Sequence, residues 1–129
     1  MAKLDISFLA DRPEALTRVS ELVHGEWGGK FHRSLEQTES DFREMLHRNQ
    51  IPFTLVGHLD GKLVATSTVV ACDLAERKDL YPWLAAVYVD ASQRGRGYGA
   101  ALVRAACERV ASLGNERLYL YTESAPGLL

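Results

Sequence analysis

The chain has 129 residues, of which 47% are hydrophobic and 25% charged, and its formal net charge is −2. This length suits one domain over residues 1–129 with a core of its own, and the composition excludes a disordered chain. The slightly acidic balance argues against a general nucleic-acid binder.

The amino terminus and the two cysteines indicate where the protein works. The first sixteen residues contain no long apolar run followed by a cleavage site, so we expect neither a signal peptide nor a membrane span. Cys72 and Cys107 lack the spacing of a metal site. Without a disulfide framework, a cytoplasmic location is expected. Cys107 falls in a predicted helix, where we expect a small buried side chain.

The first half of the chain predicts one strand and two helices. Residues 4–9 alternate apolar and polar side chains, which is typical of a strand. Asp11 then marks the start of a helix, and Gly25 allows its end. The buried stripe of this helix is expected to be Leu16, Val19, Leu22 and Val23. A second helix is expected at about 38–48, with Thr38 as its cap.

The second half predicts a hairpin and then a strand–helix–strand unit. Asp60-Gly61, between two β-rich runs in 51–72, is a strong signal for a two-residue turn. Residues 83–89 are almost continuously apolar, which favours a central strand buried on both faces. A helix over about 98–112 and a last strand over 116–122 imply a parallel, right-handed crossover. Together these elements predict a mixed α/β sheet flanked by helices.

Three glycines separate the predicted central strand from its helix. Gly95, Gly97 and Gly99 alternate there, with Arg94 and Arg96 beside them. A helix start leaves backbone N–H groups free and carries a partial positive charge, so it attracts phosphate. Glycines let the backbone approach a diphosphate and permit positive φ angles. We interpret the stretch as a pyrophosphate site, because a tight turn alone would need only one glycine.

One phosphate-binding pattern in this stretch is the dinucleotide fingerprint. Gly95-x-Gly97-x-x-Ala100 matches it, and Glu123 could serve as its ribose-binding acid. That fingerprint normally opens its domain, whereas here a hairpin-bearing half comes first.

The stretch RGRGYG could also be an arginine–glycine segment that binds RNA. Such segments are long and disordered, and the negative net charge of this chain argues against RNA binding.

A second pattern, Arg94-x-x-Gly97-x-Gly99, resembles the [QR]-x-x-G-x-[GA] signature of the GNAT acyltransferase superfamily, and the resemblance extends over essentially the whole chain. It implies a GNAT-like mixed sheet, acetyl-CoA as acyl donor, an amine as acceptor and no metal. It also implies that the backbone of Val87, Tyr88 and Val89 pairs with the pantetheine arm. The pyrophosphate loop would consist of Arg94, Gly95, Arg96, Gly97, Tyr98, Gly99 and Ala100.

The resemblance leaves the catalytic groups open. An ammonium must lose a proton before it attacks a thioester. Many GNAT enzymes carry a carboxylate on the central strand, and this chain has none there. Glu26, in the segment HGEWGGKF, and Glu123 are the candidate substitutes, and Tyr121 on the last strand is a further candidate. Trp27 could line the acceptor pocket, and Trp83 could line it or belong to the core.

The carboxyl end departs from the family pattern. There the family normally continues with a helix that carries a tyrosine acid and with two further strands, so we expect the domain to be incomplete at this end. A partner chain could supply such strands, which makes a homodimer possible. A non-catalytic CoA-binding or partner-binding module of the same fold is therefore the alternative to an N-acetyltransferase.

Overall fold

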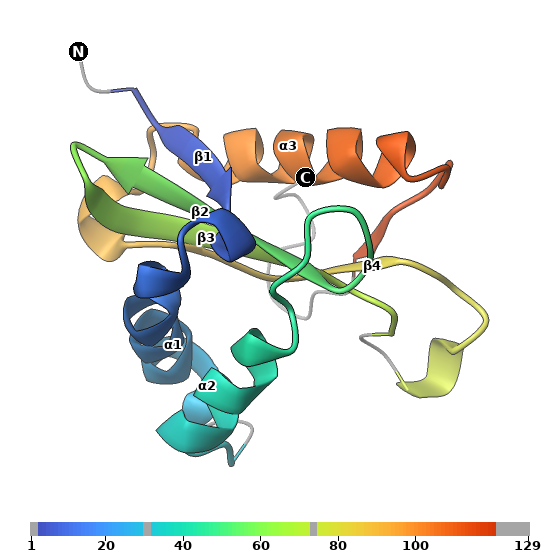
Figure 1. The fold of residues 1–129 in the computed structure, drawn as a ribbon, viewed down its shortest axis with the longest axis horizontal. Helices are drawn as coiled ribbons and strands as arrows, with labels where there is room; N and C mark the ends of the chain where they lie inside the picture. The colour runs from blue at the N-terminus through green and yellow to red at the C-terminus, as the bar shows by residue number, and fades with distance from the viewer. Residues whose placement is uncertain (1–2, 30–31, 73–74, 121–129) are drawn as a thin grey trace.

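The computed structural model describes residues 3–29, 32–72 and 75–120. Within them the chain forms one five-stranded mixed sheet, with helices on both faces (Figure 1). The strands are β1 (Asp5–Phe8), β2 (Phe53–Leu59), β3 (Lys62–Val70), β4 (Trp83–Val89) and β5 (Tyr119–Leu120). They follow one another across the sheet in chain order; β1 to β4 are antiparallel and β5 is parallel to β4. The mixed α/β architecture predicted from the sequence is confirmed.

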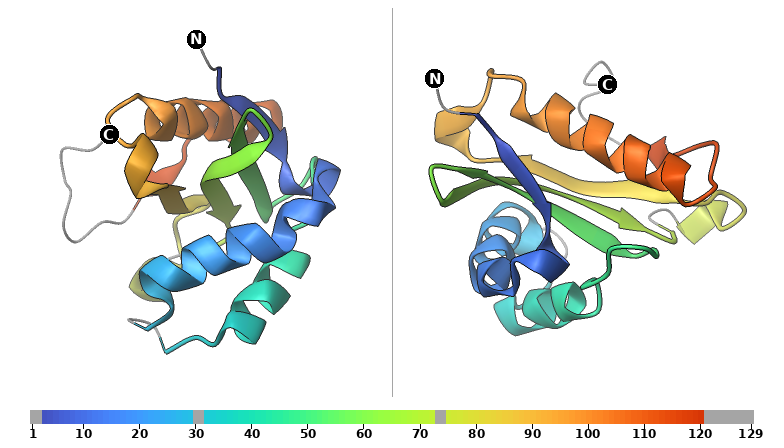
Figure 2. Two further views of the ribbon diagram at one scale, coloured as in Figure 1. Left: turned by 90° about the vertical axis from the view of Figure 1, so that its left-hand side faces the viewer. Right: turned by 45° about the horizontal axis from the view of Figure 1, so that its top comes forward.

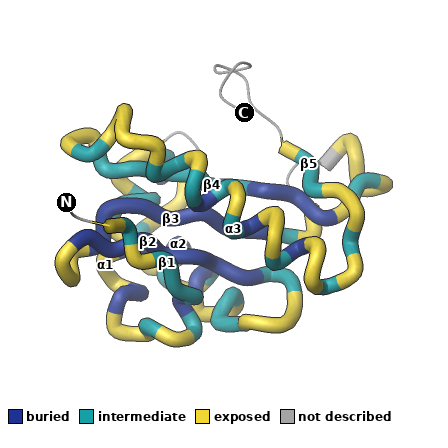
Figure 3. The backbone as a smooth tube through the Cα atoms, turned by 90° about the horizontal axis from the view of Figure 1, so that it is seen from above, coloured by how far each residue is buried: buried dark blue, intermediate teal, exposed yellow. Residues whose placement is uncertain are grey.

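Helices form a layer on each side of this sheet. Helices α1 (Leu16–Val23) and α2 (Leu35–Arg43) lie on one face, and α3 (Tyr98–Ser112) crosses the other (Figure 2). The core on the α3 side contains Phe53, Leu55, Leu59, Val64, Ala65, Val69, Leu84, Leu102, Ala106 and Val110. The core under α1 and α2 contains Leu9, Ala15, Leu16, Val19, Phe42, Val56 and Leu63. The deepest backbone therefore runs along β2 and β3, in the middle of the sheet (Figure 3).

The first helix does not end where the sequence predicted. After α1 the chain continues through one π-helical turn, His24–Gly28, which passes over Gly25. A glycine ends a helix when it adopts a left-handed φ, and Gly25 is not among the glycines with positive φ. Asp11 is not a cap either. It lies in a short 3₁₀ turn and forms an ion pair with Arg48.

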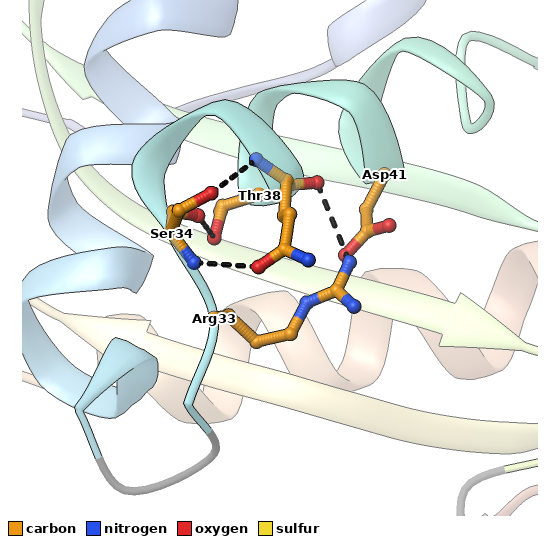
Figure 4. Close-up of polar contacts among 5 residues, drawn as sticks. Arg33, Ser34, Thr38 and Asp41 are labelled. Atoms are coloured by element: carbon orange, nitrogen blue, oxygen red, sulfur yellow. Dashed lines mark hydrogen bonds and ion pairs between the residues drawn. The ribbon is translucent and has the colours of Figure 1, made fainter.

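The second helix begins before its predicted start, at a different cap. The Oγ atom of Ser34 accepts from the backbone N–H of Gln37 at 3.1 Å, and the Gln37 side chain accepts from the Ser34 N–H at 2.8 Å, which is a capping box (Figure 4). Thr38 is buried within the helix, where its hydroxyl donates to the Ser34 carbonyl. Arg33 and Asp41 form an ion pair across the first turns.

The third helix has the predicted bounds, but one of its side chains is not buried as predicted. Leu102, Ala106 and Val110 are buried against the sheet, as the 3.6-residue period requires. Cys107 is exposed, contrary to the prediction, because it lies one position beyond the buried stripe. Among the described residues no helix is long and apolar enough to cross a membrane.

Candidate functional site

The second half of β4 is paired along one edge only in the described structure. The parallel register joins Trp83 to Tyr119 and Leu84 to Leu120. From residue 85 onward β4 pairs with β3 but with no described residue of β5. Residues 85–89 are only half-buried, so the prediction of a strand buried on both faces holds for its first two residues alone. An unpaired edge offers N–H and C=O groups to an extended ligand.

A β-bulge distorts the same half of β4 along its other edge, where it pairs with β3. Two residues of β4, Ala86 and Val87, oppose the single residue Ser67 of β3. Ala86 has a φ of +52°, a left-handed value that is uncommon for a residue other than glycine. The buried Ser67 hydroxyl next to the bulge has no hydrogen-bond partner in the described residues. Bulges re-aim a strand and gather at active sites, so this one marks the strand as a candidate binding element.

The glycines after β4 have different roles. Gly95 and Gly97 have φ angles of +81° and +83°, and a Cβ atom on either would meet no atom within 4 Å. Their backbone conformation, not crowding, therefore requires glycine. Gly99 lies inside α3, where a Cβ would sit 3.5 Å from the Cγ2 atom of Val89, an ordinary contact. The fold of the chain itself thus gives no reason for glycine at position 99.

The amino terminus of α3 has the properties of an anion site. Gly97 is its N-cap residue, no side chain in the described part of the chain caps the helix, and no acidic residue lies in the first turn. The free N–H groups and the helix dipole therefore face the glycine loop. Arg94 and Arg96 are exposed on that loop. Together the loop and the helix start provide donors and positive charge for a phosphate group.

One carboxylate lies close to this loop. The side chain of Asp90, directly after β4, accepts a hydrogen bond from the hydroxyl of Ser92, which holds the pKa of that carboxyl below its usual range. The positive charges of Lys62 and Arg18 lower this pKa further. Asp90 is therefore charged near neutral pH, and its backbone N–H donates to the Val64 carbonyl at 2.7 Å, which fixes the end of β4 to β3.

Arg94 and the π-helical turn meet at Tyr88. The Nε atom of Arg94 donates to the carbonyl oxygen of Val89 at 2.8 Å, and its guanidinium carbon lies 5.6 Å from the centre of the Tyr88 ring. Trp27, from the turn His24–Gly28, meets the same ring edge-on, with 6.1 Å between the ring centres. This turn therefore lies beside β4, and it carries the exposed carboxylate of Glu26.

The other predicted side chains divide into two groups. Trp83 is 3% exposed and donates from Nε1 to the Leu80 carbonyl at 2.8 Å, so it belongs to the core and not to a pocket. Glu123 and Tyr121 lie outside the described residues. In the part of the chain that the structure describes, no group of His, Cys, Asp and Glu side chains is arranged to hold a metal ion.

Sequence reasoning missed the bulge and the π-helical turn. The adjacent small residues Ala85 and Ala86, inside a run of large β-formers, are the signal that could have located the bulge, since alanine tolerates a left-handed φ better than a β-branched residue. The π-helical turn has no comparable signal. Its one sequence-visible requirement is Gly28, where a Cβ would lie 2.3 Å from the ring of His24.

Comparison with known proteins identifies the family. Residues 16–126 match the Acetyltransferase (GNAT) family. No curated protein matches the sequence at a significant level.

Solved structures share the fold at low sequence identity. An aminoglycoside N-acetyltransferase in complex with CoA matches with a TM-score of 0.78 and 19% identity, over 96% of this chain and 80% of the other. A ribosomal-protein-alanine N-acetyltransferase from Brucella melitensis matches at 0.68 and 17%, over 96% and 83%. A predicted acetyltransferase with acetyl-CoA from Clostridium acetobutylicum matches at 0.70 and 9%, over 96% and 82%.

Proposed function

Because the chain belongs to the GNAT acetyltransferase family, we propose that it transfers an acetyl group from acetyl-CoA to a primary amine of a small molecule or a protein. One observation carries the proposal: the glycine loop enters the start of α3 directly after a strand whose second half pairs with no described residue along one edge. A phosphate site and an extended-chain site are thus adjacent, which is the combination that a diphosphate with a long pantetheine arm requires.

The residues at this site fit CoA. The N–H groups of residues 94–100 would hold the pyrophosphate, with Arg94 and Arg96 adding charge, and the backbone of 87–89 would pair with the pantetheine arm. Open space at the α-carbons of Gly95 and Gly97 supports a close approach by the diphosphate. Acetyl-CoA would supply the thioester that the acceptor amine attacks. Dinucleotide binding lacks comparable support, since this chain matches a different family.

The bulge supports a catalytic use of β4. The register pairs neither Ala86 nor Val87 with a residue of β3. Backbone donors that leave the regular ladder are available to polarise a carbonyl oxygen, and such donors contribute several kcal/mol in acyl transfer, about 2.7–4 for one of them. We assign this role to the backbone at 86–87, beside the segment that would hold the pantetheine arm.

Of the candidate catalytic residues, Glu26 lies in the described part of the chain, and we assign it the role of general base. It is exposed on the turn that brings Trp27 against Tyr88, and we place the acceptor on this side of β4. A carboxylate there would attract the cationic acceptor and take its proton, directly or through water. Glu123 and Tyr121 stay further proposals for the same chemistry.

A non-catalytic CoA-binding module is the second candidate. The observation that favours it is the sequence of β4, WLAAVYV, which carries no carboxylate next to the proposed thioester position. The two candidates share the CoA site and differ only in turnover, so binding and turnover must be measured separately.

The experiment measures both on the same protein. Calorimetric titration with acetyl-CoA, with NADH as the control ligand, tests the site, and saturable binding of acetyl-CoA alone is expected. Release of free CoA thiol is then followed over a panel of amines that includes an aminoglycoside and a peptide with amino-terminal alanine. Binding without thiol release for any amine would favour the non-catalytic module. Binding of neither ligand would refute the site.

Substitution of the base separates chemistry from binding. Glu26→Gln should lower kcat/KM by about 100-fold or more, the usual contribution of a general base, and leave the affinity for acetyl-CoA unchanged. Glu21→Gln is the matched control, because Glu21 is an exposed carboxylate of α1 that pairs with Arg18. Equal effects of the two substitutions would exclude Glu26 as the base.

A further inference from the structure

Tyr88 connects the proposed CoA loop to the proposed acceptor side, and we propose that it is a positioning residue which couples the two sites. The inference rests on the proposed function, since it concerns the same CoA and acceptor sites. It says that CoA binding at Arg94 changes the environment of Trp27, and that an acceptor binds more tightly once CoA is present. Its evidence is the contact of one ring with two side chains from separate elements.

The first contact fixes the guanidinium of Arg94. Its Nε atom is committed to the Val89 carbonyl, and its carbon lies over the Tyr88 ring at 5.6 Å. A guanidinium has five N–H donors in a rigid plane, and this arrangement uses one of them. No described residue accepts from its Nη atoms, so four donors stay available to a phosphate. Without the ring, the exposed side chain of Arg94 would keep only one anchor and would lose more freedom on binding.

The second contact joins the Tyr88 ring to Trp27 of the π-helical turn. Trp27 and Tyr88 are both half-buried and meet edge to face, with an interplanar angle of 75°. The turn that carries Trp27 is held from within, because the ring of His24 packs on the α-carbon of Gly28 with no room for a Cβ. A change in the position of the Tyr88 ring is therefore met by Trp27 itself, next to Glu26.

The coupling has a direction that follows from electrostatics. A free guanidinium over an aromatic face is held by its charge. A bound pyrophosphate accepts hydrogen bonds from the Nη atoms and so restrains the guanidinium plane, which restrains the ring below it as well. A restrained Tyr88 restrains Trp27 before the acceptor arrives. The protein then loses less conformational entropy when the acceptor binds. Thermodynamic linkage requires the acceptor to strengthen CoA binding by the same factor.

A double-mutant cycle tests the link between Tyr88 and Arg94. Acetyl-CoA affinity is measured by calorimetry for wild type, Arg94→Gln, Tyr88→Leu and the double variant. Tyr88→Leu should weaken binding about three-fold in the wild-type background, the size of an exposed cation–π contact. It should have no effect once Arg94 is glutamine, and Tyr88→Phe should behave as wild type. An equal loss in both backgrounds would overturn the proposal, because a role in folding alone does not depend on Arg94.

Fluorescence tests the link from Tyr88 to Trp27. Acetyl-CoA should change the tryptophan emission of the wild type, and at saturating acetyl-CoA the change should disappear in Trp27→Phe, which keeps Trp83. It should also shrink in Tyr88→Leu at saturating acetyl-CoA. Emission that does not respond to bound CoA, or a response that persists in Trp27→Phe, would refute the coupling while the proposed function stands. Absence of any calorimetric CoA binding would refute the proposed function and the coupling together.

Discussion

Gly97 and Gly114 stand at opposite ends of α3 in the same left-handed conformation. Their φ angles are +83° and +91°, and a Cβ atom on either would meet nothing within 4 Å. At each position there is therefore room for a methyl group, but a residue with a Cβ is strained at this positive φ. The two residues differ in one respect: only Gly97 lies in the loop that we assign to the CoA pyrophosphate. They form a matched pair for testing that assignment.

Alanine at these two positions should separate stability from binding. Gly97→Ala and Gly114→Ala should each lower the free energy of unfolding by about 1–2 kcal/mol, because alanine is strained at positive φ. Only Gly97→Ala should weaken acetyl-CoA binding, by at least about ten-fold, since its Cβ enters the space that the diphosphate needs. Urea unfolding and calorimetry measure the two effects. Equal affinities of the two variants for acetyl-CoA would place the pyrophosphate elsewhere.

Gly99 should respond in the opposite way. It is the second residue of α3, where the backbone is already helical and the fold leaves room for a Cβ. Gly99→Ala should therefore raise the free energy of unfolding by about 0.5–1 kcal/mol, because alanine loses less backbone entropy than glycine. If the glycine serves the approach of CoA, the same variant should bind acetyl-CoA more weakly.

A second glycine provides the control for this prediction. Gly29 also has a helical φ, −65°, a Cβ atom there would meet nothing within 4 Å, and it lies outside the glycine loop. Gly29→Ala should gain stability without any loss of CoA affinity. A stabilised Gly99→Ala protein with wild-type affinity would show that position 99 does not contact the ligand.

Local patterns predicted much of the fold. Asp60 and Gly61 both have positive φ, +50° and +82°, which is the two-residue turn that their sequence indicated. The apolar run at 83–89 became β4, and α3 starts and ends at its predicted residues. These features depend on residues close in sequence, because the φ angles of a turn or a glycine loop are set by the residues of that segment itself. The position of the proposed CoA loop could therefore be predicted from its own residues.

Features set by tertiary packing were not predictable. Ser34 and Thr38 are both good N-caps, and the structure uses Ser34 because that start buries Thr38 and Phe42 against the rest of the fold. The bulge at Ala86 depends on the register between β3 and β4, which no pattern in β4 alone determines. The contact between Trp27 and Tyr88 joins residues far apart in the chain. The sequence named Glu26 and Trp27 as candidates but could not show that their turn lies beside Tyr88.

The cap of α2 predicts a clear difference between two serines. Ser34→Ala removes the acceptor for the Gln37 N–H and should lower the free energy of unfolding by about 1 kcal/mol. Ser40 is exposed in the middle of the same helix, so Ser40→Ala should be neutral or slightly stabilising, because alanine has the higher helix propensity. Urea unfolding of both variants measures the difference. Equal losses would mean that the capping box contributes nothing to stability.

His58 gives the protein a pH-dependent stability. Its side chain is 5% exposed on β2, and its Nδ1 atom has no partner in the described residues. Burial lowers the pKa of His58 below its ordinary value of 6.5, and the positive charge of Arg12 lowers it further, against the smaller opposing effects of Asp5 and Glu14. The folded protein therefore holds this imidazole neutral at a pH where the unfolded chain is already protonated.

The sign of the effect follows from proton binding. Below pH 6.5 the unfolded state takes up a proton at His58 that the folded state does not, so acid favours unfolding until the pH passes the lowered pKa of the folded state. The stability that depends on a neutral His58 is therefore present in full above about pH 6.5 and is lost as the pH falls toward the lowered pKa of the folded state. Urea unfolding at about pH 7.5 and about pH 5.5 should show a smaller loss of stability for His58→Gln than for wild type. Parallel pH profiles of the two proteins would contradict the role of His58, because the remaining titrating groups are common to both.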